Sequence, residues 1–159
     1  MKIRIICIGK LKEKYWTSAA AEYSKRISGY ANIEIVELKE SKLPSNPSEA
    51  DENSVLIREG QNILSKIKDN DHVIAMEVEG EQLDSVELAK KIQHAFDTKS
   101  STIDFVVGGS LGLSDEVKKR ADYGLSFSKL TFPHQMARIM LLEQIYRAFK
   151  INSGETYHK

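Results

Sequence analysis

The sequence FVVGGSLGL at residues 105–113 is followed, further along the chain, by LSFSKLTFPH at residues 125–134. Each segment begins with a short apolar run of the kind that forms a buried strand, and continues into small or polar residues. In open α/β sheets, ligands bind beside the loops that leave the carboxyl ends of the strands. We therefore expect these two loops to form opposite walls of one small-molecule pocket.

Strand-like and helix-like segments alternate along the whole chain. Short runs rich in β-branched residues predict strands at residues 3–8, 33–38, 72–78, 102–107 and 123–127. Helical spacing of apolar residues predicts helices at residues 13–28, from 50 or 53 to 67, at 85–96, from 114 and at 133–150. This alternation is typical of a parallel sheet covered on both faces, so we predict an α/β fold with a single domain over residues 1–159.

The 159 residues include 23 Lys and Arg and 23 Asp and Glu, so the formal net charge is zero. The charges are nevertheless uneven: residues 1–30 hold seven basic and two acidic side chains, residues 31–100 eight and fifteen, and residues 101–159 eight and six. If the two basic ends meet in space, they form a positive patch; the alternative is that these are solvated faces of ordinary helices.

Cysteine content and hydropathy predict where the protein works. Cys7 is the only cysteine, which excludes an intrachain disulfide and fits a reducing compartment. No apolar stretch approaches the ~20 residues that span a bilayer, and no small-residue cleavage site follows the apolar start. We expect a cytoplasmic protein without a membrane segment.

The glycines of the first loop allow a close approach to the backbone. Gly108 and Gly109 leave space for a ligand, and a helix capped by Ser114 adds partial positive charge. The loop lacks the G-x-G-x-x-G pattern of dinucleotide sites and the Gly-Lys-Ser/Thr of phosphate-binding P-loops. A tight strand-to-helix turn uses similar residues without any ligand, so both interpretations stay open.

The second loop, Phe127–Phe132, alternates apolar and hydroxyl residues before Pro133. Proline favours an extended conformation at Phe132 and suits the first turn of a helix. Backbone groups bounded by aromatic residues fit the edge and faces of an adenine-like ring. The alternative is an ordinary buried connection.

The last predicted helix is apolar around most of its circumference. Such a helix is buried on two sides, which we assign to the protein's own sheet and to a second subunit, giving a homodimer. Its spacing places His134 and Arg138 on one face, with Glu143 and Arg147 roughly opposite as an ion pair.

The final residues, Tyr157-His158-Lys159, combine an aromatic ring, an imidazole and a cation. They form either a disordered tail or a surface that stacks on and neutralises an unpaired nucleotide.

Seven segments spread over the chain form one pattern. They are IGKLKEKYW (8–16), EGQ (59–61), VVGGS (106–110), LSFSK (125–129), TFPHQM (131–136), EQIYRA (143–148) and YHK (157–159). In this order they resemble the ribosomal RNA large subunit methyltransferase H family, small bacterial members of the SPOUT methyltransferase class. The resemblance implies a parallel-sheet α/β knot fold with a C-terminal trefoil knot, an exception to the rule that chains do not thread loops.

The resemblance also implies an activity and partners. It implies a homodimer that methylates N3 of a pseudouridine in 23S ribosomal RNA with S-adenosyl-L-methionine, and no metal. By position, the cofactor contacts fall at Met76, Gly108, Phe127, Ser128, Lys129, Leu130, Thr131 and Phe132. Met76 stands where the family often has leucine, a swap of similar volume.

The catalytic residues implied on the substrate side are Arg138, Tyr157 and His158. N3 carries a proton that must leave, and an imidazole can accept a proton near neutral pH, so His158 is the candidate general base. Tyr157 is expected to stack on the target base. Because one small subunit does not surround both cofactor and RNA, we expect the loops of one subunit to face the final residues or the N-terminal basic segment of the other.

Two other interpretations remain. A non-catalytic ribosome-binding protein would bind RNA through its basic ends with steep salt dependence and would bind no cofactor. A flavodoxin-like or other nucleotide-binding enzyme would bind a flavin or a dinucleotide instead.

Overall fold

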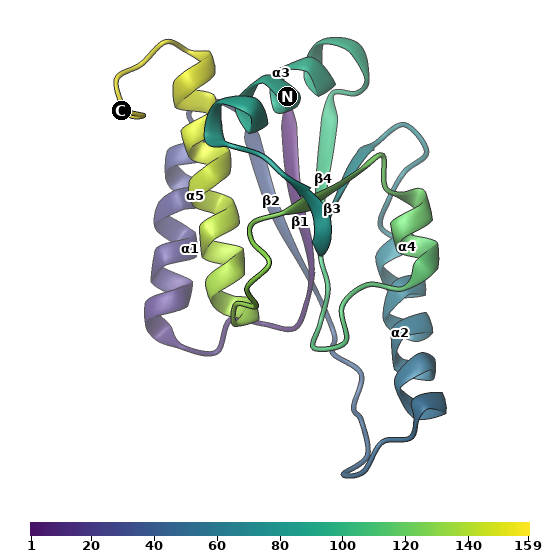
Figure 1. The fold of residues 1–159 in the computed structure, drawn as a ribbon. Coiled ribbons are helices and arrows are strands. Elements are labelled where there is room, and N and C mark those ends of the chain that lie inside the picture. Colours follow the sequence, from purple (N-terminus) through teal and green to yellow (C-terminus); the bar gives the residue numbers. More distant parts are fainter.

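A computed structural model describes residues 1–159 as five parallel strands in one sheet with five helices around it (Figure 1). The strands, in the spatial order β2-β1-β4-β3-β5, are β1 (Lys2–Ile8), β2 (Asn32–Leu38), β3 (His72–Gln82), β4 (Thr102–Val107) and β5 (Tyr123–Ser126). The helices are α1 (Lys14–Ile27), α2 (Glu49–Leu64), α3 (Ser85–Thr98), α4 (Asp115–Arg120) and α5 (His134–Asn152). Every predicted strand and helix is present in the predicted order.

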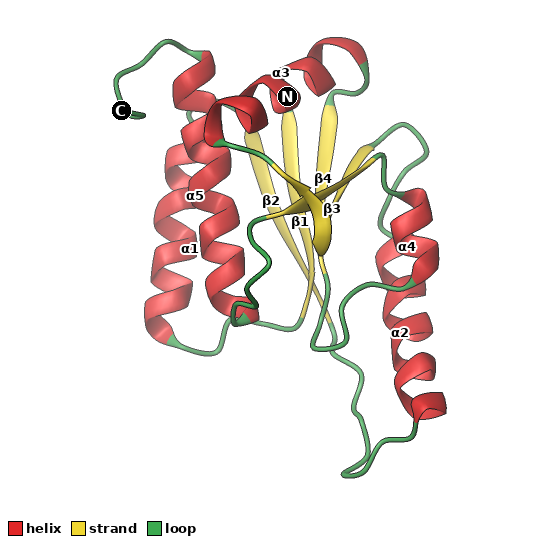
Figure 2. Ribbon diagram, in the orientation of Figure 1, coloured by secondary structure: helices red, strands yellow, loops and turns green.

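Helices cover both faces of the sheet (Figure 2). On one face, α1, α3 and α5 enclose the larger core, to which β1 contributes Ile5 and β4 contributes Phe105. On the other face, α2 and α4 cover a smaller core that includes Ile6 and Val106. Because successive strand residues point to opposite faces and both faces are covered, β1 and β4 are buried along almost their whole length, as expected of central strands in a parallel sheet. Apart from their first residues, Arg4 and Asp104 are the only charged or polar residues in these two strands.

Strand β3 is longer than predicted and ends at Gln82 rather than at Val78. Its last part pairs with β5 after a register shift between Met76 and Glu81. A Cβ at Gly80 would lie 2.7 Å from the backbone of Leu125, so the two backbones approach this closely only because residue 80 is glycine. The sequence pattern did not predict this extension, because residues 79–82 are polar or glycine and lack the apolar, β-branched residues typical of a strand. The trefoil knot implied by the resemblance stays a prediction.

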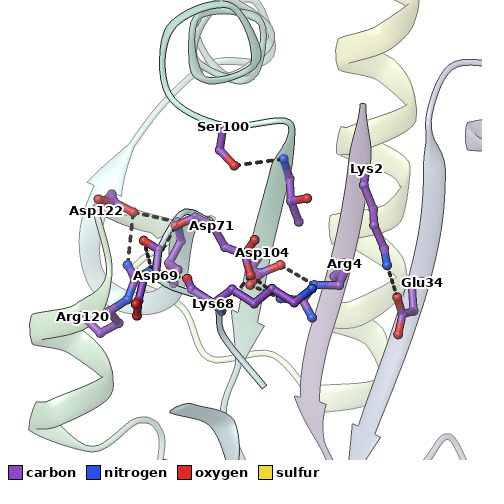
Figure 3. A network of polar contacts seen from close by, with 12 residues as sticks. Lys2, Arg4, Glu34, Lys68, Asp69, Asp71, Ser100, Asp104, Arg120 and Asp122 are labelled. Carbon is purple, nitrogen blue, oxygen red and sulfur yellow. Dashed lines mark hydrogen bonds and ion pairs between the residues drawn. The ribbon is translucent and has the colours of Figure 1, made fainter. Parts of the chain in front are cut away.

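A network of polar contacts joins the sheet near the amino ends of its strands (Figure 3). Arg4 donates to Asp104 at 2.6 and 2.7 Å and to Asp71 at 2.6 Å, and all three residues are buried. Arg120 donates to the carbonyl oxygens of Lys68 and Asp71 at 2.9 and 3.0 Å. The charged groups at this edge of the sheet are therefore paired with one another or with backbone carbonyls. The loops that line a cavity lie at the opposite edge, where the strands have their carboxyl ends.

Candidate functional site

A cavity of about 470 Å³ opens at the carboxyl ends of β3, β4 and β5. Its volume lies within the range of small-molecule sites. Residues 108–113, here called the glycine loop, and the 127–132 loop both line it, so the two loops share one pocket as predicted. Of the eight cofactor residues implied by the resemblance, the cavity is lined by Met76, Gly108, Phe127, Ser128, Leu130, Thr131 and Phe132, and Lys129 is exposed outside it.

The glycine loop is a tight turn closed on itself. Gly109 and Gly112 form an antiparallel bridge, in which the Gly112 N–H donates to the Gly109 carbonyl at 3.1 Å. Gly112 has a φ of +80°, and a Cβ at Gly108 would lie 2.4 Å from the Gly112 carbonyl oxygen. The turn therefore requires these glycines for its own geometry. The predicted cap of the next helix is confirmed, since the Ser114 hydroxyl accepts from the Val117 N–H at 3.4 Å.

The second loop is shaped by its serines. The Ser126 hydroxyl donates to the Ser128 carbonyl at 3.1 Å, and the Ser128 hydroxyl accepts from the Leu130 N–H at 3.0 Å. The Leu130 side chain is left 70% exposed although it is apolar and lines the cavity. A large apolar side chain in this position offers a surface on which a ligand ring can pack.

Acidic residues in the second half of β3 form a part of the site that the sequence patterns missed. Glu77 and Glu79 line the cavity, and Lys118 of α4 lies opposite with its Nζ 3.7 Å from a Glu77 carboxylate oxygen. Carboxylates accept hydrogen bonds from hydroxyl and ammonium groups. Glu77 lay within the predicted strand 72–78, but no sequence signal marked it as part of a site, and Glu79 lay beyond the predicted end of that strand.

Glu59 of α2 lies behind the glycine loop and is 4% exposed. Its Oε2 accepts from the Ser41 N–H at 3.0 Å, and its Oε1 would be 3.1 Å from a Cβ at Gly109. Burial raises the pKa of this carboxyl, and the Ser41 N–H opposes the shift. Glu59 thus holds the loop after β2 beside the glycine loop.

The last residues fold back on α5. The Tyr157 hydroxyl donates to Glu143 at 3.1 Å, and the Arg147 guanidinium lies 4.7 Å from the centre of the Tyr157 ring. Glu143 and Arg147 form the predicted ion pair at 2.6 Å. Burial, followed by the Glu143 contact, raises the pKa of Tyr157. In this structure the aromatic residue is packed against the helix.

His158 is exposed and lies beside a second depression. Its Nδ1 is 3.4 Å from Arg147 Nη1. Because a guanidinium only donates, this contact leaves Nδ1 as acceptor and places the proton of a neutral ring on Nε2. The depression measures about 500 Å³ and shares Leu125, Ser126 and Phe127 with the cavity, so these three residues form a common wall.

Arg138 lies apart from the other two predicted catalytic residues. Its side chain is 2% exposed and donates to Glu37 at 2.8 Å and to the Gly9 carbonyl at 3.1 Å. It precedes Arg147 by nine positions on α5, which is roughly 13 Å along a helix axis. The structure therefore brings Tyr157 and His158 together and places Arg138 in a separate, buried contact.

None of the helices combines the length and the apolar character that a membrane span requires. No group of three or more His, Cys, Asp or Glu side chains is arranged to hold a metal ion.

Comparison with known proteins identifies the family of this fold and cavity. A family model described as predicted SPOUT methyltransferase matches residues 1–158. The chain belongs to the SPOUT methyltransferase family. This SPOUT chain is 56% identical to ribosomal RNA large subunit methyltransferase H of Clostridium perfringens, 55% to that of Clostridium novyi and 54% to that of Lactobacillus acidophilus, each time over the full length of both chains. The resemblance drawn from the seven segments is confirmed.

Proposed function

We propose that the protein transfers a methyl group from S-adenosyl-L-methionine to N3 of a pseudouridine in 23S ribosomal RNA. The observation that carries the proposal is the cavity at the carboxyl ends of β3, β4 and β5 in a chain of the SPOUT family. Full-length relatives more than half identical to it are named ribosomal RNA large subunit methyltransferase H. We also propose that the protein acts in the cytoplasm, because its proposed substrate is ribosomal RNA.

The cavity fits a cofactor of this chemistry. When bound, S-adenosyl-L-methionine supplies an activated methyl group on a sulfonium. Exposed Leu130 offers an apolar surface to an adenine ring, and the glycine loop brings backbone close to a ligand. Glu77 offers acceptors to hydroxyl or ammonium groups. The proposed contacts are Met76, Gly108 and residues 127–132, with Lys129 reaching the cofactor only after a shift of its loop.

His158 is proposed to take the N3 proton. In the present arrangement its acceptor nitrogen faces Arg147, so the base role requires the imidazole to turn away from the guanidinium when RNA binds. Tyr157 is proposed to stack on the target base after leaving its contact with Glu143. For Arg138, its buried contacts support a positioning role rather than contact with the base.

A homodimer is proposed to complete the site. The outer face of α5 carries Met136, which is 38% exposed, and half-buried Met140, one turn further along. We propose that a second copy covers this face and that the final residues of one subunit then face the loops of the other. Mixing a His158→Ala subunit with a Gly108→Ala subunit tests this: recovery of activity in the mixture supports a composite site, and no recovery contradicts it.

The activity is tested in two steps. Calorimetry with S-adenosyl-L-methionine measures cofactor binding, and labelled-methyl transfer to ribosomal RNA and to ribosomes that lack the modification measures catalysis. Mass spectrometry of the nucleosides should locate the methyl group at N3 of a pseudouridine. RNA affinity with steep salt dependence but no cofactor binding would support a non-catalytic ribosome-binding protein. Binding of a flavin or a dinucleotide would instead support a flavodoxin-like or other nucleotide-binding enzyme.

A further inference from the structure

The loop after β1 is held beside the mouth of the cavity by the first turns of α5. The Lys12 N–H donates to Gln135 at 2.7 Å, and the Gly9 carbonyl accepts from Arg138 at 3.1 Å. The Leu11 N–H donates to Glu37 at 3.3 Å. Gln135 follows His134, which lines the cavity. These contacts hold the backbone of this loop against α5. Residues 10–16 are here called the docking segment; its exposed side chains are Lys10, Lys12, Glu13, Lys14 and Tyr15, whereas Leu11 and Trp16 are half-buried.

The docking segment concentrates positive charge. Lys10, Lys12 and Lys14 are exposed, and none of their amino groups has a carboxylate oxygen within 4.0 Å. Two arginines of the basic chain ends are by contrast paired, Arg26 with Glu22 and Arg147 with Glu143. Helix α1 begins at Lys14, and the partial positive charge of its start adds to the lysines, although the carboxylate of Glu13 at the N-cap offsets part of it. The docking segment thus carries three positive charges and one negative charge.

The docking segment also presents aromatic rings. Tyr15 is 64% exposed, and its ring meets that of half-buried Trp16 edge to face with centroids 5.1 Å apart. Exposed aromatic rings among unpaired cations are suited to unpaired nucleotides, since the rings stack on bases and the cations neutralise phosphates. Charge complementarity favours RNA over contact with the docking segment of a second copy of this chain, which carries the same charge.

We propose that the docking segment binds an unpaired stretch of the RNA substrate beside the cavity, with its lysines on phosphates and Tyr15 stacked on a base. This inference rests on the proposed function and adds a site to it. The site is separate from the cofactor loops and from Tyr157 and His158. Its lysines are proposed to raise the affinity for RNA and to make no contact with the reacting atoms.

The test compares two triple variants with the same change in net charge. Lys10→Gln, Lys12→Gln and Lys14→Gln are combined in one, and the exposed Lys25→Gln, Lys66→Gln and Lys90→Gln in the control. We expect the first to raise KM for RNA at least tenfold and to flatten the salt dependence of binding, because each lost phosphate contact lowers the slope by about 0.7. The affinity for S-adenosyl-L-methionine and kcat at saturating RNA should not change.

Stacking is tested separately. Tyr15→Ala should weaken RNA binding roughly 5- to 100-fold, the range for one stacked base. Trp16 is the only tryptophan, so its fluorescence should respond when RNA is titrated into the otherwise unmodified protein. This measurement uses the unmodified protein and so does not depend on whether a variant folds.

Three results would overturn the inference. In the first, the docking-segment variant matches its control in KM. In the second, Trp16 fluorescence does not respond to RNA that the protein methylates. In the third, the variant becomes monomeric, which would assign the segment to contact between copies. If the unmodified protein fails to bind the cofactor or to transfer methyl groups, the proposed function itself fails, and this result is distinguishable from the other three.

Discussion

The Arg138 guanidinium and the Glu37 carboxylate form an ion pair of 2.8 Å that joins α5 to the end of β2. The same Glu37 oxygen accepts from the Leu11 N–H at 3.3 Å, and Arg138 also reaches the Gly9 carbonyl. One buried guanidinium thus ties together a helix, a strand and the loop after β1. Arg138 follows His134, which lines the cavity, by about one turn of α5.

Replacing Arg138 should destabilise the fold. Arg138→Met removes the guanidinium that donates to Glu37 and to the carbonyl oxygens of Ile8 and Gly9, and leaves Glu37 with the Leu11 N–H as its remaining donor. Removing one partner of a buried pair costs several kcal/mol, which we reduce to about 2 kcal/mol because the Glu37 side chain is 33% exposed. Urea unfolding measures the change. If stability stays unchanged while kcat falls, Arg138 is catalytic and its buried contacts are unimportant.

Gly108→Ala should impair cofactor binding. The new Cβ would lie 2.4 Å from the Gly112 carbonyl oxygen, so the glycine loop must shift. We expect the affinity for S-adenosyl-L-methionine to fall at least tenfold, since misplaced backbone loses close ligand contacts. Calorimetry measures the affinity. The matched control is Gly29→Ala, where the nearest atom is the Arg26 carbonyl oxygen at an ordinary 3.6 Å, and equal effects of both changes would argue against a role of the loop.

The sequence predicted most of the fold because its signals are local. β-branched runs, glycine stops and the cap at Ser114 each act within a few residues, and all five strands and helices follow from them. The two cavity walls were also predictable, since carboxyl ends of parallel strands meet at one edge. The acidic end of β3 was missed because its pairing depends on a long-range fit between Gly80 and the backbone of β5.

Side-chain partners were the least predictable part of the site. The spacing of α5 placed His134 and Arg138 on one face, but only the packed structure shows Arg138 facing Glu37, a residue 101 positions away. The Glu143–Arg147 pair was predictable because both members lie on the same helix.

His72 should make stability sensitive to mild acid. Burial lowers its pKa below 6.5, although Asp122 opposes the shift. Between 6.5 and the lower folded pKa, the unfolded chain binds more protons than the folded one, so stability falls as the pH decreases through this range. His72→Gln should remove this part of the pH dependence. Urea unfolding between pH 5 and pH 8 measures it, and parallel profiles for both proteins would contradict the assignment.

Cys7 should be unreactive in the folded protein. It is fully buried in β1, its Sγ donates to the Val36 carbonyl at 3.6 Å, and burial raises its pKa to about 11. The thiolate is the reactive form, so alkylation at pH 8 should proceed only through unfolding. Mass spectrometry after iodoacetamide treatment, with and without urea, measures the reaction. Rapid labelling without urea would show that β1 opens locally.

Glu59 should support the glycine loop through its shape and acceptor rather than its charge. Since burial raises its pKa above 4.5, the ionised form is disfavoured in the fold, and stability falls as the pH rises through the folded pKa. Glu59→Gln keeps an acceptor for the Ser41 N–H and removes the charge, so it should be as stable as the parent at pH 7 and lack this pH dependence.

Glu59→Ala should behave differently. It leaves the Ser41 N–H without its acceptor and opens space behind Gly109, which should cost about 1–3 kcal/mol. Because Gly109 then loses its support, cofactor affinity should fall as well, whereas Glu59→Gln should retain it. Urea unfolding and calorimetry on both variants measure the difference. If Glu59→Gln lost cofactor affinity while it kept its stability, the negative charge of Glu59, rather than the packing of the two loops, would matter to the site.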